Sequence, residues 1–252
     1  VSLGASARLC QHSRMLGRFL EISLYAPDIQ SSLGFYEELG FTQLNVGETW
    51  SHPYAVVTDG HLFIGLHDYR FDSPSLTYAR PELANQVRNL EDSGIMFAFR
   101  KLSDDQFNEA GFKDPDGQMV SLLEARTYSP YTGGEEDFSI LGRCSEYCIA
   151  VADIDASAQF WEPLGFVMTD REEKPSPRAL LISDCINLGL YGGNRLLRPG
   201  LVFTEPDMDR RIEFLIAKDM RIARPSPLPN AGELSAVLES PEGFDLHLLV
   251  GE

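Results

Sequence analysis

The sequence has few cysteines, a shortage of basic residues and no long apolar run. Its four cysteines, Cys10, Cys144, Cys148 and Cys185, are too scattered for a disulfide framework, so we expect a reducing, cytoplasmic environment. Lys and Arg number 21 against 38 Asp and Glu, and the formal charge of −17 disfavours nucleic acid and anionic membrane surfaces as partners. No stretch approaches the roughly 20 apolar residues of a membrane span.

The composition is otherwise that of a folded protein. Hydrophobic residues make up 43% and charged residues 23%, close to the average for globular domains. A chain of 252 residues makes one large domain or two modest ones. Residues 1–16 do not resemble a signal peptide, and we expect them to form a disordered tail. Because strand-like sequence follows Met15, we also expect the native start to lie near that residue.

The chain contains an internal repeat. A shift of 125 positions places eleven residues on identical residue types between 142 and 166: Gly17, Arg18, Glu21, Asp28, Ile29, Ser32, Phe35, Glu37, Leu39, Gly40 and Phe41. The turn at 114–117 (Asp-Pro-Asp-Gly) recurs at 240–243 as Ser-Pro-Glu-Gly. We therefore predict two similar domains, 17–126 and 140–252, joined by a linker at 127–139 that is rich in turn-forming and charged residues.

Each half is predicted to contain two amphipathic helices. Apolar residues recur at i, i+4 and i+7 in four places: Ile29, Leu33, Tyr36; Leu83, Val87, Leu90; Ile154, Ala158, Trp161; and Met208, Ile212, Leu215. A carboxylate stands at each of the four predicted N-termini: Asp28, Glu82, Asp153 and Asp207. The first three helices end at Gly40, Gly94 and Gly165, and the fourth ends at Asp219. Since short β-like runs flank each helix, the sequence predicts four β-α-β-β-β units.

With this repeat and its paired helix exits, Phe35-Tyr36…Leu39-Gly40-Phe41 and Phe160-Trp161…Leu164-Gly165-Phe166, the chain resembles tandem members of the vicinal oxygen chelate superfamily. That superfamily includes glyoxalase I, bleomycin resistance proteins and extradiol dioxygenases. The resemblance implies an α+β fold in which four units pair into two curved, incomplete mixed β-barrels with helices outside. Each concave face, called a cup below, would hold a ligand. The sequence leaves open whether units pair within each half or across the halves.

Alternation along the predicted strands separates a helix side from a cup side. In the first strand Ile22, Leu24 and Ala26 form the apolar side, which leaves Glu21 and its alternate neighbours for the cup. The same reasoning places these side chains in the cups: Ser23, Tyr25 and His67 in the first half, and Glu146, Cys148, Asn187, Tyr191, Asp245 and His247 in the second. Polar groups that converge on a concave surface are typical of a ligand site.

The resemblance also indicates where metal-dependent relatives hold their ligands. The matching positions are Glu21, Gly65, a residue near Ser75, and Ser121 in the first half, and Glu146, Gly189, a residue near Gly200, and His247 in the second. Glycine offers no ligand and serine is a poor one. A two-His-one-carboxylate iron site cannot be assembled from one matching histidine. We therefore expect no cofactor, with a divalent metal as the less favoured alternative.

Without a metal, Glu21 and Glu146 are the candidate catalytic bases, because a carboxylate in a partly apolar cup suits that role. His247 is the candidate acid or anion-binding group, and the candidate substrate-binding residues are Tyr25, His67, Ser121, Cys148, Asn187, Tyr191 and Asp245. The resemblance implies lyase or isomerase chemistry on a small organic molecule. The alternatives are a protein that sequesters a small molecule and a metal-dependent dioxygenase. Each glutamate could instead pair with an arginine such as Arg18 or Arg143, and the chain could be a monomer or homodimer.

Overall fold

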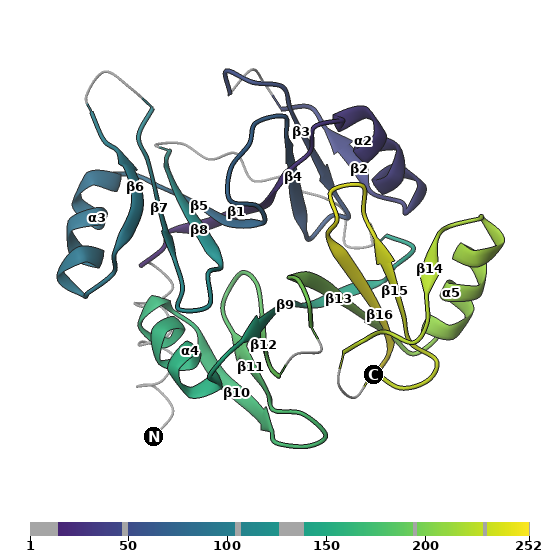
Figure 1. Ribbon diagram of the computed structural model, residues 1–252. Helices are drawn as coiled ribbons and strands as arrows, with labels where there is room; N and C mark the ends of the chain where they lie inside the picture. Colours follow the sequence, from purple (N-terminus) through teal and green to yellow (C-terminus); the bar gives the residue numbers. More distant parts are fainter. Residues whose placement is uncertain are drawn as a thin grey trace.

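Strand-like runs with apolar residues on alternate positions form two eight-stranded sheets, one in each half of the chain (Figure 1). The computed structural model describes residues 15–46, 50–103, 107–125, 139–193, 196–228 and 231–251. Residues 1–14 of the predicted tail and nearly all of the predicted linker lie outside these residues, so the domain boundaries stay predictions.

The sheet of the first half has the strand order β2-β3-β4-β1-β5-β8-β7-β6. Its strands are β1 (Arg18–Tyr25), β2 (Thr42–Leu44), β3 (Tyr54–Thr58), β4 (Phe63–His67), β5 (Ser75–Arg80), β6 (Phe97–Lys101), β7 (Glu109–Lys113) and β8 (Met119–Glu124). β1 pairs parallel with β4, and β5 pairs parallel with β8. The two units of this half meet where β1 and β5 run antiparallel.

The sheet of the second half repeats this order as β10-β11-β12-β9-β13-β16-β15-β14. Its strands are β9 (Arg143–Val151), β10 (Val167–Glu172), β11 (Arg178–Ile182), β12 (Leu188–Gly192), β13 (Gly200–Glu205), β14 (Ile222–Ala223), β15 (Ala236–Glu239) and β16 (Asp245–Val250). Each half therefore pairs its own two units. The predicted α+β fold with two curved, incomplete barrels is confirmed, and the pairing of units that the sequence left open is sequential.

The four predicted helices form with their apolar stripes buried. They are α2 (Ile29–Glu38), α3 (Leu83–Asp92), α4 (Ile154–Trp161) and α5 (Met208–Ala217), and a short 3₁₀ helix, η1 (Glu162–Leu164), extends α4. Asp28 and Asp153 cap their helices by accepting hydrogen bonds from backbone amides, as predicted. The same prediction is wrong for Glu82 and Asp207, whose side chains make no capping bond. Within the described residues, no helix is long and apolar enough to cross a membrane.

The repeated turns of the sequence join the two halves. Asp116, in the turn between β7 and β8, accepts hydrogen bonds from the Ala152 amide at 2.7 Å and from the Ser157 hydroxyl of α4. In the corresponding turn between β15 and β16, Glu242 accepts a hydrogen bond at 3.4 Å from the hydroxyl of Tyr36 in α2. Figure 1 shows each turn reaching the helix of the other half. The duplicated turn therefore fixes how the halves sit together.

Candidate functional site

A buried carboxylate, Glu21, lies at the centre of the first cup. The residue is 2% exposed. Its Oε1 accepts hydrogen bonds from Ser23 Oγ at 2.7 Å and from His67 Nε2 at 2.9 Å, and its Oε2 accepts one from the Tyr54 hydroxyl. No lysine or arginine in the described part of the chain forms an ion pair with Glu21. Two hydroxyls and one imidazole therefore hold this carboxylate.

Gly65 on the neighbouring strand β4 makes room for the carboxylate. It pairs with Ser23 of β1, so its missing side chain would point into the cup beside Glu21. A Cβ added at Gly65 would lie 2.1 Å from Glu21 Oε1, far inside the van der Waals limit. The glycine at this predicted ligand position thus serves to let the glutamate lie across the strand.

A chain of hydrogen bonds leads outward from Glu21. His67 Nδ1 lies 3.0 Å from Nε2 of His52, a half-buried residue in the loop before β3. Because a carboxylate can only accept, His67 Nε2 carries a hydrogen, and in a neutral ring its Nδ1 then accepts from His52 Nε2–H. Burial is the main cause that lowers the pKa of His52, and the nearby His67 lowers it further, so the neutral form of His52 is favoured. The chain runs Glu21–His67–His52.

Aromatic rings surround this chain. The ring of Trp50 lies 5.4 Å from those of both His52 and His67 and 5.5 Å from that of Phe107, measured between centroids. Tyr69 stacks on His52 at 5.1 Å. Tyr54, His67 and Phe71 complete an aromatic cluster that consists of Trp50, His52, Tyr54, His67, Tyr69, Phe71 and Phe107. The first cup thus combines a buried acid with flat apolar walls.

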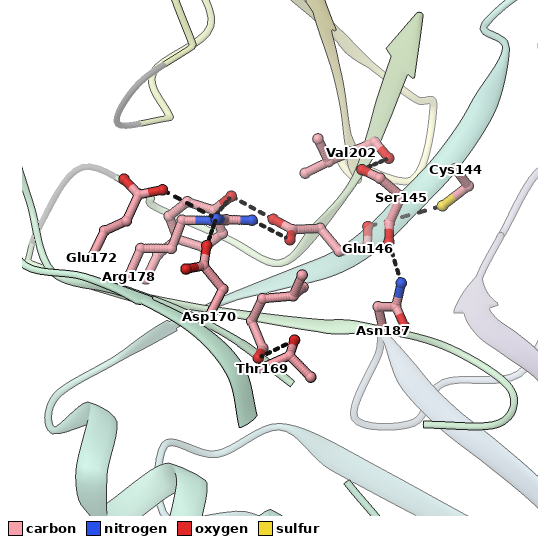
Figure 2. Close-up of polar contacts among 11 residues, drawn as sticks. Cys144, Ser145, Glu146, Thr169, Asp170, Glu172, Arg178, Asn187 and Val202 are labelled. Carbon is pink, nitrogen blue, oxygen red and sulfur yellow. Dashed lines mark hydrogen bonds and ion pairs between the residues drawn. The ribbon is translucent and has the colours of Figure 1, made fainter. Parts of the chain in front are cut away.

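The second cup holds the duplicated glutamate, Glu146, in an ion pair (Figure 2). Arg178 of β11 donates from Nη2 to Glu146 Oε2 at 2.6 Å, and the Tyr191 hydroxyl donates to Oε1. Arg178 also lies within 3.8 Å of Asp170 and Glu172 on β10. A Cβ at Gly189 would lie 2.5 Å from Glu146 Oε1, so the glutamate-over-glycine arrangement of the first cup recurs.

The two cups use equivalent positions with different chemistry. Tyr54, Gly65 and His67 each have a counterpart 124 residues later, at Arg178, Gly189 and Tyr191. Strand register agrees, because Tyr54 pairs with His67 across β3 and β4, and Arg178 pairs with Tyr191 across β11 and β12. A permanent cation neutralises the buried glutamate of the second cup, whereas a titratable imidazole contacts that of the first.

His247 lies in the second cup on β16 and is separated from Glu146 by one strand, since Val202 of β13 pairs with both. The histidine is 0% exposed. Its Nδ1 lies 3.0 Å from Ser226 Oγ, and its Nε2 has no hydrogen-bond partner in the described residues. Beside it lies an apolar cluster of Cys148, Tyr191, Leu196, Val202 and Leu228. Burial, assisted by the positive charge of Arg198, lowers the pKa of His247 to about 4.

We expect His247 to make the protein less stable as the pH falls. The free imidazole titrates near 6.5, so between this value and about 4 the unfolded chain binds a proton that the folded protein excludes. Stability from this group is complete above the higher value and is lost toward the lower one, by roughly 3 kcal/mol in all. Urea unfolding at pH 7.5 and 4.5 should show this loss in the protein but not in His247→Gln; equal losses would contradict the prediction.

The structure separates the other predicted site residues. Asp245 pairs with Arg198 Nη2 at 3.1 Å, and Ser121 bonds to Ser75 Oγ at 2.7 Å. Asn187 donates to the Ser145 carbonyl at 2.9 Å instead of to a cup group (Figure 2). Tyr25 lies opposite His67 in the sheet, with Arg70 at 6.0 Å from its ring, and Cys148 is buried in the apolar cluster.

The sequence did not reveal the aromatic walls of the first cup, Trp50, Tyr69, Phe71 and Phe107, or three residues of the polar contacts: His52, Tyr54 and Arg178. The signal for Tyr54 and Arg178 was their equivalent place in the repeat, which a search for identical residues overlooks. His52 lies in a loop without periodicity, so no pattern indicated that it would meet His67. The proposed alternative that Glu146 pairs with an arginine is realised, but through Arg178 and not Arg143.

Comparison with solved structures identifies the fold. Catechol 2,3-dioxygenase superposes with a TM-score of 0.60 at 15% identity, covering 94% of this chain and 88% of that chain. A 2,2',3-trihydroxybiphenyl 1,2-dioxygenase from Sphingomonas wittichii strain RW1 gives 0.63 at 15% identity, covering 94% and 91%. Homoprotocatechuate 2,3-dioxygenase from Arthrobacter globiformis gives 0.65 at 14%, covering 94% and 80%. The chain has the tandem vicinal oxygen chelate fold. Its sequence matches no family model and no curated protein.

The expectation that no cofactor is involved is contradicted by this comparison. The extradiol dioxygenases that share the fold use a catalytic metal ion, so a chain with this fold gives no ground for expecting a site without a cofactor. The expectation of no cofactor rested on glycine and serine at the positions where metal-dependent relatives hold their ligands. Those residue types alone do not decide whether a protein of this fold uses a metal.

The side chains of the described residues do not reproduce the donor set of an iron site. No group of three or more His, Cys, Asp or Glu in this part of the chain is placed to hold a metal ion. Glu146 is engaged by Arg178 and Tyr191, and a guanidinium in direct contact competes with a metal cation for the same oxygens. Glu21, His67 and His52 follow one another in a hydrogen-bonded chain and do not converge on one point, so neither cup fits a two-His-one-carboxylate centre as its side chains are placed.

Proposed function

We propose that the first cup binds a small organic molecule and moves a proton on it, as a lyase or isomerase does. The observation that carries the proposal is the hydrogen-bonded chain from Glu21 through His67 to His52, which runs from a buried carboxylate to a half-buried imidazole. A base backed by a second group that orients it and stabilises its protonated form is the usual arrangement for general acid-base catalysis.

The proton has a defined route in this chain. With both rings neutral, His52 Nε2 donates to His67 Nδ1 and His67 Nε2 donates to Glu21 Oε1, which leaves the lone pair of His52 Nδ1 to accept the ligand's proton. As His52 gains this proton, its Nε2 hydrogen can pass to His67, whose positive charge Glu21 stabilises. The reverse sequence returns the proton to a second position on the ligand. His52 is thus the contacting base, and His67 and Glu21 position and support it.

The walls of the cup favour a flat ligand. Trp50 and Tyr69 present rings beside His52, Phe107 lies against Trp50, and Tyr69 and Phe107 are exposed. Aromatic walls stack on planar molecules and exclude water from the reacting atoms. The solved structures with this fold include enzymes named for catechol, trihydroxybiphenyl and homoprotocatechuate, which supports a small aromatic ligand for this chain.

Hydrogen exchange tests the proposal without a known product. Small aromatic compounds that carry a C–H next to a carbonyl are incubated with the protein in D₂O, with and without added Fe²⁺ or Mn²⁺. Proton NMR should show loss of that C–H signal in at least one compound, and His67→Gln should slow this loss by about 100-fold. His61→Ala, which removes an exposed histidine on another turn, should leave the rate unchanged.

Other outcomes would replace the proposal. Binding at His52 without exchange in any compound would indicate a protein that sequesters a small molecule. Exchange that survives His67→Gln would place the chemistry elsewhere. Oxygen consumption with catechols only after a metal is added would instead indicate a dioxygenase.

A further inference from the structure

We propose that the first cup selects organic cations, so that the ligand supplies the positive charge that the second cup supplies from its own chain. The inference rests on the proposed function only in taking the first cup as the ligand site. The inference concerns the charge of the ligand, which the fold alone does not indicate.

The first observation is a buried carboxylate that no lysine or arginine of the described residues neutralises. Glu21 is almost fully buried, and among the described residues its carboxylate is held by the Ser23 and Tyr54 hydroxyls and the His67 imidazole. A buried charge is costly unless an opposite charge or a full set of hydrogen bonds accompanies it. Three donors leave one of the four lone-pair directions of the carboxylate unfilled. The site is therefore poised to gain from a nearby cation.

The second observation is the duplicated cup, where the chain provides that cation. Arg178 occupies the position of Tyr54 and contacts both the Glu146 carboxylate and the Tyr191 hydroxyl, while its guanidinium carbon lies 5.5 Å from the Tyr191 ring centroid. In the second half, the arrangement of a glutamate over a glycine thus binds the planar guanidinium of Arg178 against the Tyr191 ring. In the first half this arrangement is kept and the arginine is absent.

The third observation is the surrounding charge and shape. Asp68 and Glu109 both act on His52 as negative charges, Trp50 and Tyr69 offer ring faces and edges next to it, and Phe107 lies against Trp50. Cations are attracted to the negative faces of aromatic rings. The charge of −17 adds a long-range field that draws cations toward the chain.

Three probes with one ring and different charges test the inference: benzamidinium, benzamide and benzoate. Binding is measured at neutral pH by calorimetry and by the imidazole NMR signals of His52 and His67, which report on this cup. We expect benzamidinium to bind and to shift both histidines, with benzamide about tenfold weaker or more. Benzoate should not bind, because it would face Glu21 in a low-dielectric cup.

Two variants locate the charge that is recognised. Glu21→Gln removes the carboxylate and should weaken benzamidinium by about tenfold or more while changing benzamide little. Tyr54→Arg copies the second cup into the first and should weaken benzamidinium similarly, since its guanidinium competes for Glu21. Conversely, Arg178→Ala should open a second benzamidinium site at Glu146 and raise the stoichiometry from one to two.

The remaining outcomes overturn the inference and leave the proposed function to its own test. If benzamide or benzoate shifts the two histidines as strongly as benzamidinium does, the cup is a small-molecule site without cation selectivity. If benzamidinium binds equally well to Glu21→Gln, the carboxylate is not the recognised charge. If none of the probes shifts the histidines, cation selectivity is wrong, and the hydrogen-exchange experiment decides whether the cup moves protons.

Discussion

Arg178→Ala is expected to lower the free energy of unfolding by about 3–5 kcal/mol, the largest stability change predicted for this chain. The guanidinium contacts a glutamate that is 3% exposed, and its own side chain is 19% exposed. Removing it leaves the Glu146 carboxylate buried, with the Tyr191 hydroxyl as its hydrogen-bond partner among the described side chains. The melting temperature should fall by roughly 10 °C for a protein of this size.

A neighbouring arginine provides the matched control. Arg171, one strand away on β10, pairs with Asp155 and Glu173 at the surface, and Arg171→Ala should cost far less stability than Arg178→Ala because such pairs are screened by water. In the double variant Arg178→Ala/Glu146→Gln the buried charge is gone, so part of the stability should return. Equal losses in the two single variants, measured by urea unfolding, would show that the ion pair of the second cup acts like a surface pair.

The fold could be predicted from the sequence because its signals are local and repeated. The apolar stripes ending at Tyr36 and Trp161 locate helices in both halves, and both side chains are fully buried. Helix ends were predicted equally well where backbone geometry decides them: Asp219 adopts a positive φ of 63°, the conformation that Gly40, Gly94 and Gly165 take in the other units. Capping was less predictable. Asp207 bonds to Arg211 of its own helix, and this contact competes with the cap.

The site residues could be predicted only on the first strand of each half, where the two halves of the repeat share identical residues. Glu21 and Glu146 face the cups as alternation indicated, because inward and outward positions follow from the pleat alone. Their partners come from strands whose register depends on loop lengths, and a single-residue difference in offset, 124 instead of 125, separates the two parts of the repeat. The duplicated positions also differ in residue type, and that difference is what distinguishes the cups.

The cofactor illustrates a different limit. Missing ligands at Gly65 and Gly189 suggested a site without a metal, yet the solved structures with this fold belong to enzymes that use one. The glycines have their own physical reason, since each lies beneath a glutamate carboxylate. The glycines at these two positions therefore explain how each glutamate packs, but they do not decide whether the cup binds a metal.

This packing predicts a large change in activity for Gly65→Ala. The new Cβ would lie 2.1 Å from Oε1 and 2.3 Å from Cδ of Glu21, so the carboxylate must leave its place. Gly65 is not among the residues with positive φ, and the clashing group is the end of a flexible side chain, so the fold should lose only about 1–3 kcal/mol. Hydrogen exchange on a ligand of the first cup should nevertheless fall by about 100-fold, as far as in His67→Gln, because Glu21 acts through His67.

Gly189→Ala is the matched control for this prediction, because it displaces Glu146 from Arg178 in the second cup by the same contact, 2.5 Å from Oε1. If the first cup carries the chemistry, this variant loses stability and keeps its exchange rate, whereas Gly65→Ala keeps most of its stability and loses exchange. The reverse pattern would assign the chemistry to the second cup. The same added methyl group thus separates catalysis in the first cup from stabilisation of the fold in the second. His67 needs the Glu21 carboxylate within hydrogen-bonding distance, whereas the ion pair of Arg178 with Glu146 takes part in no proton transfer.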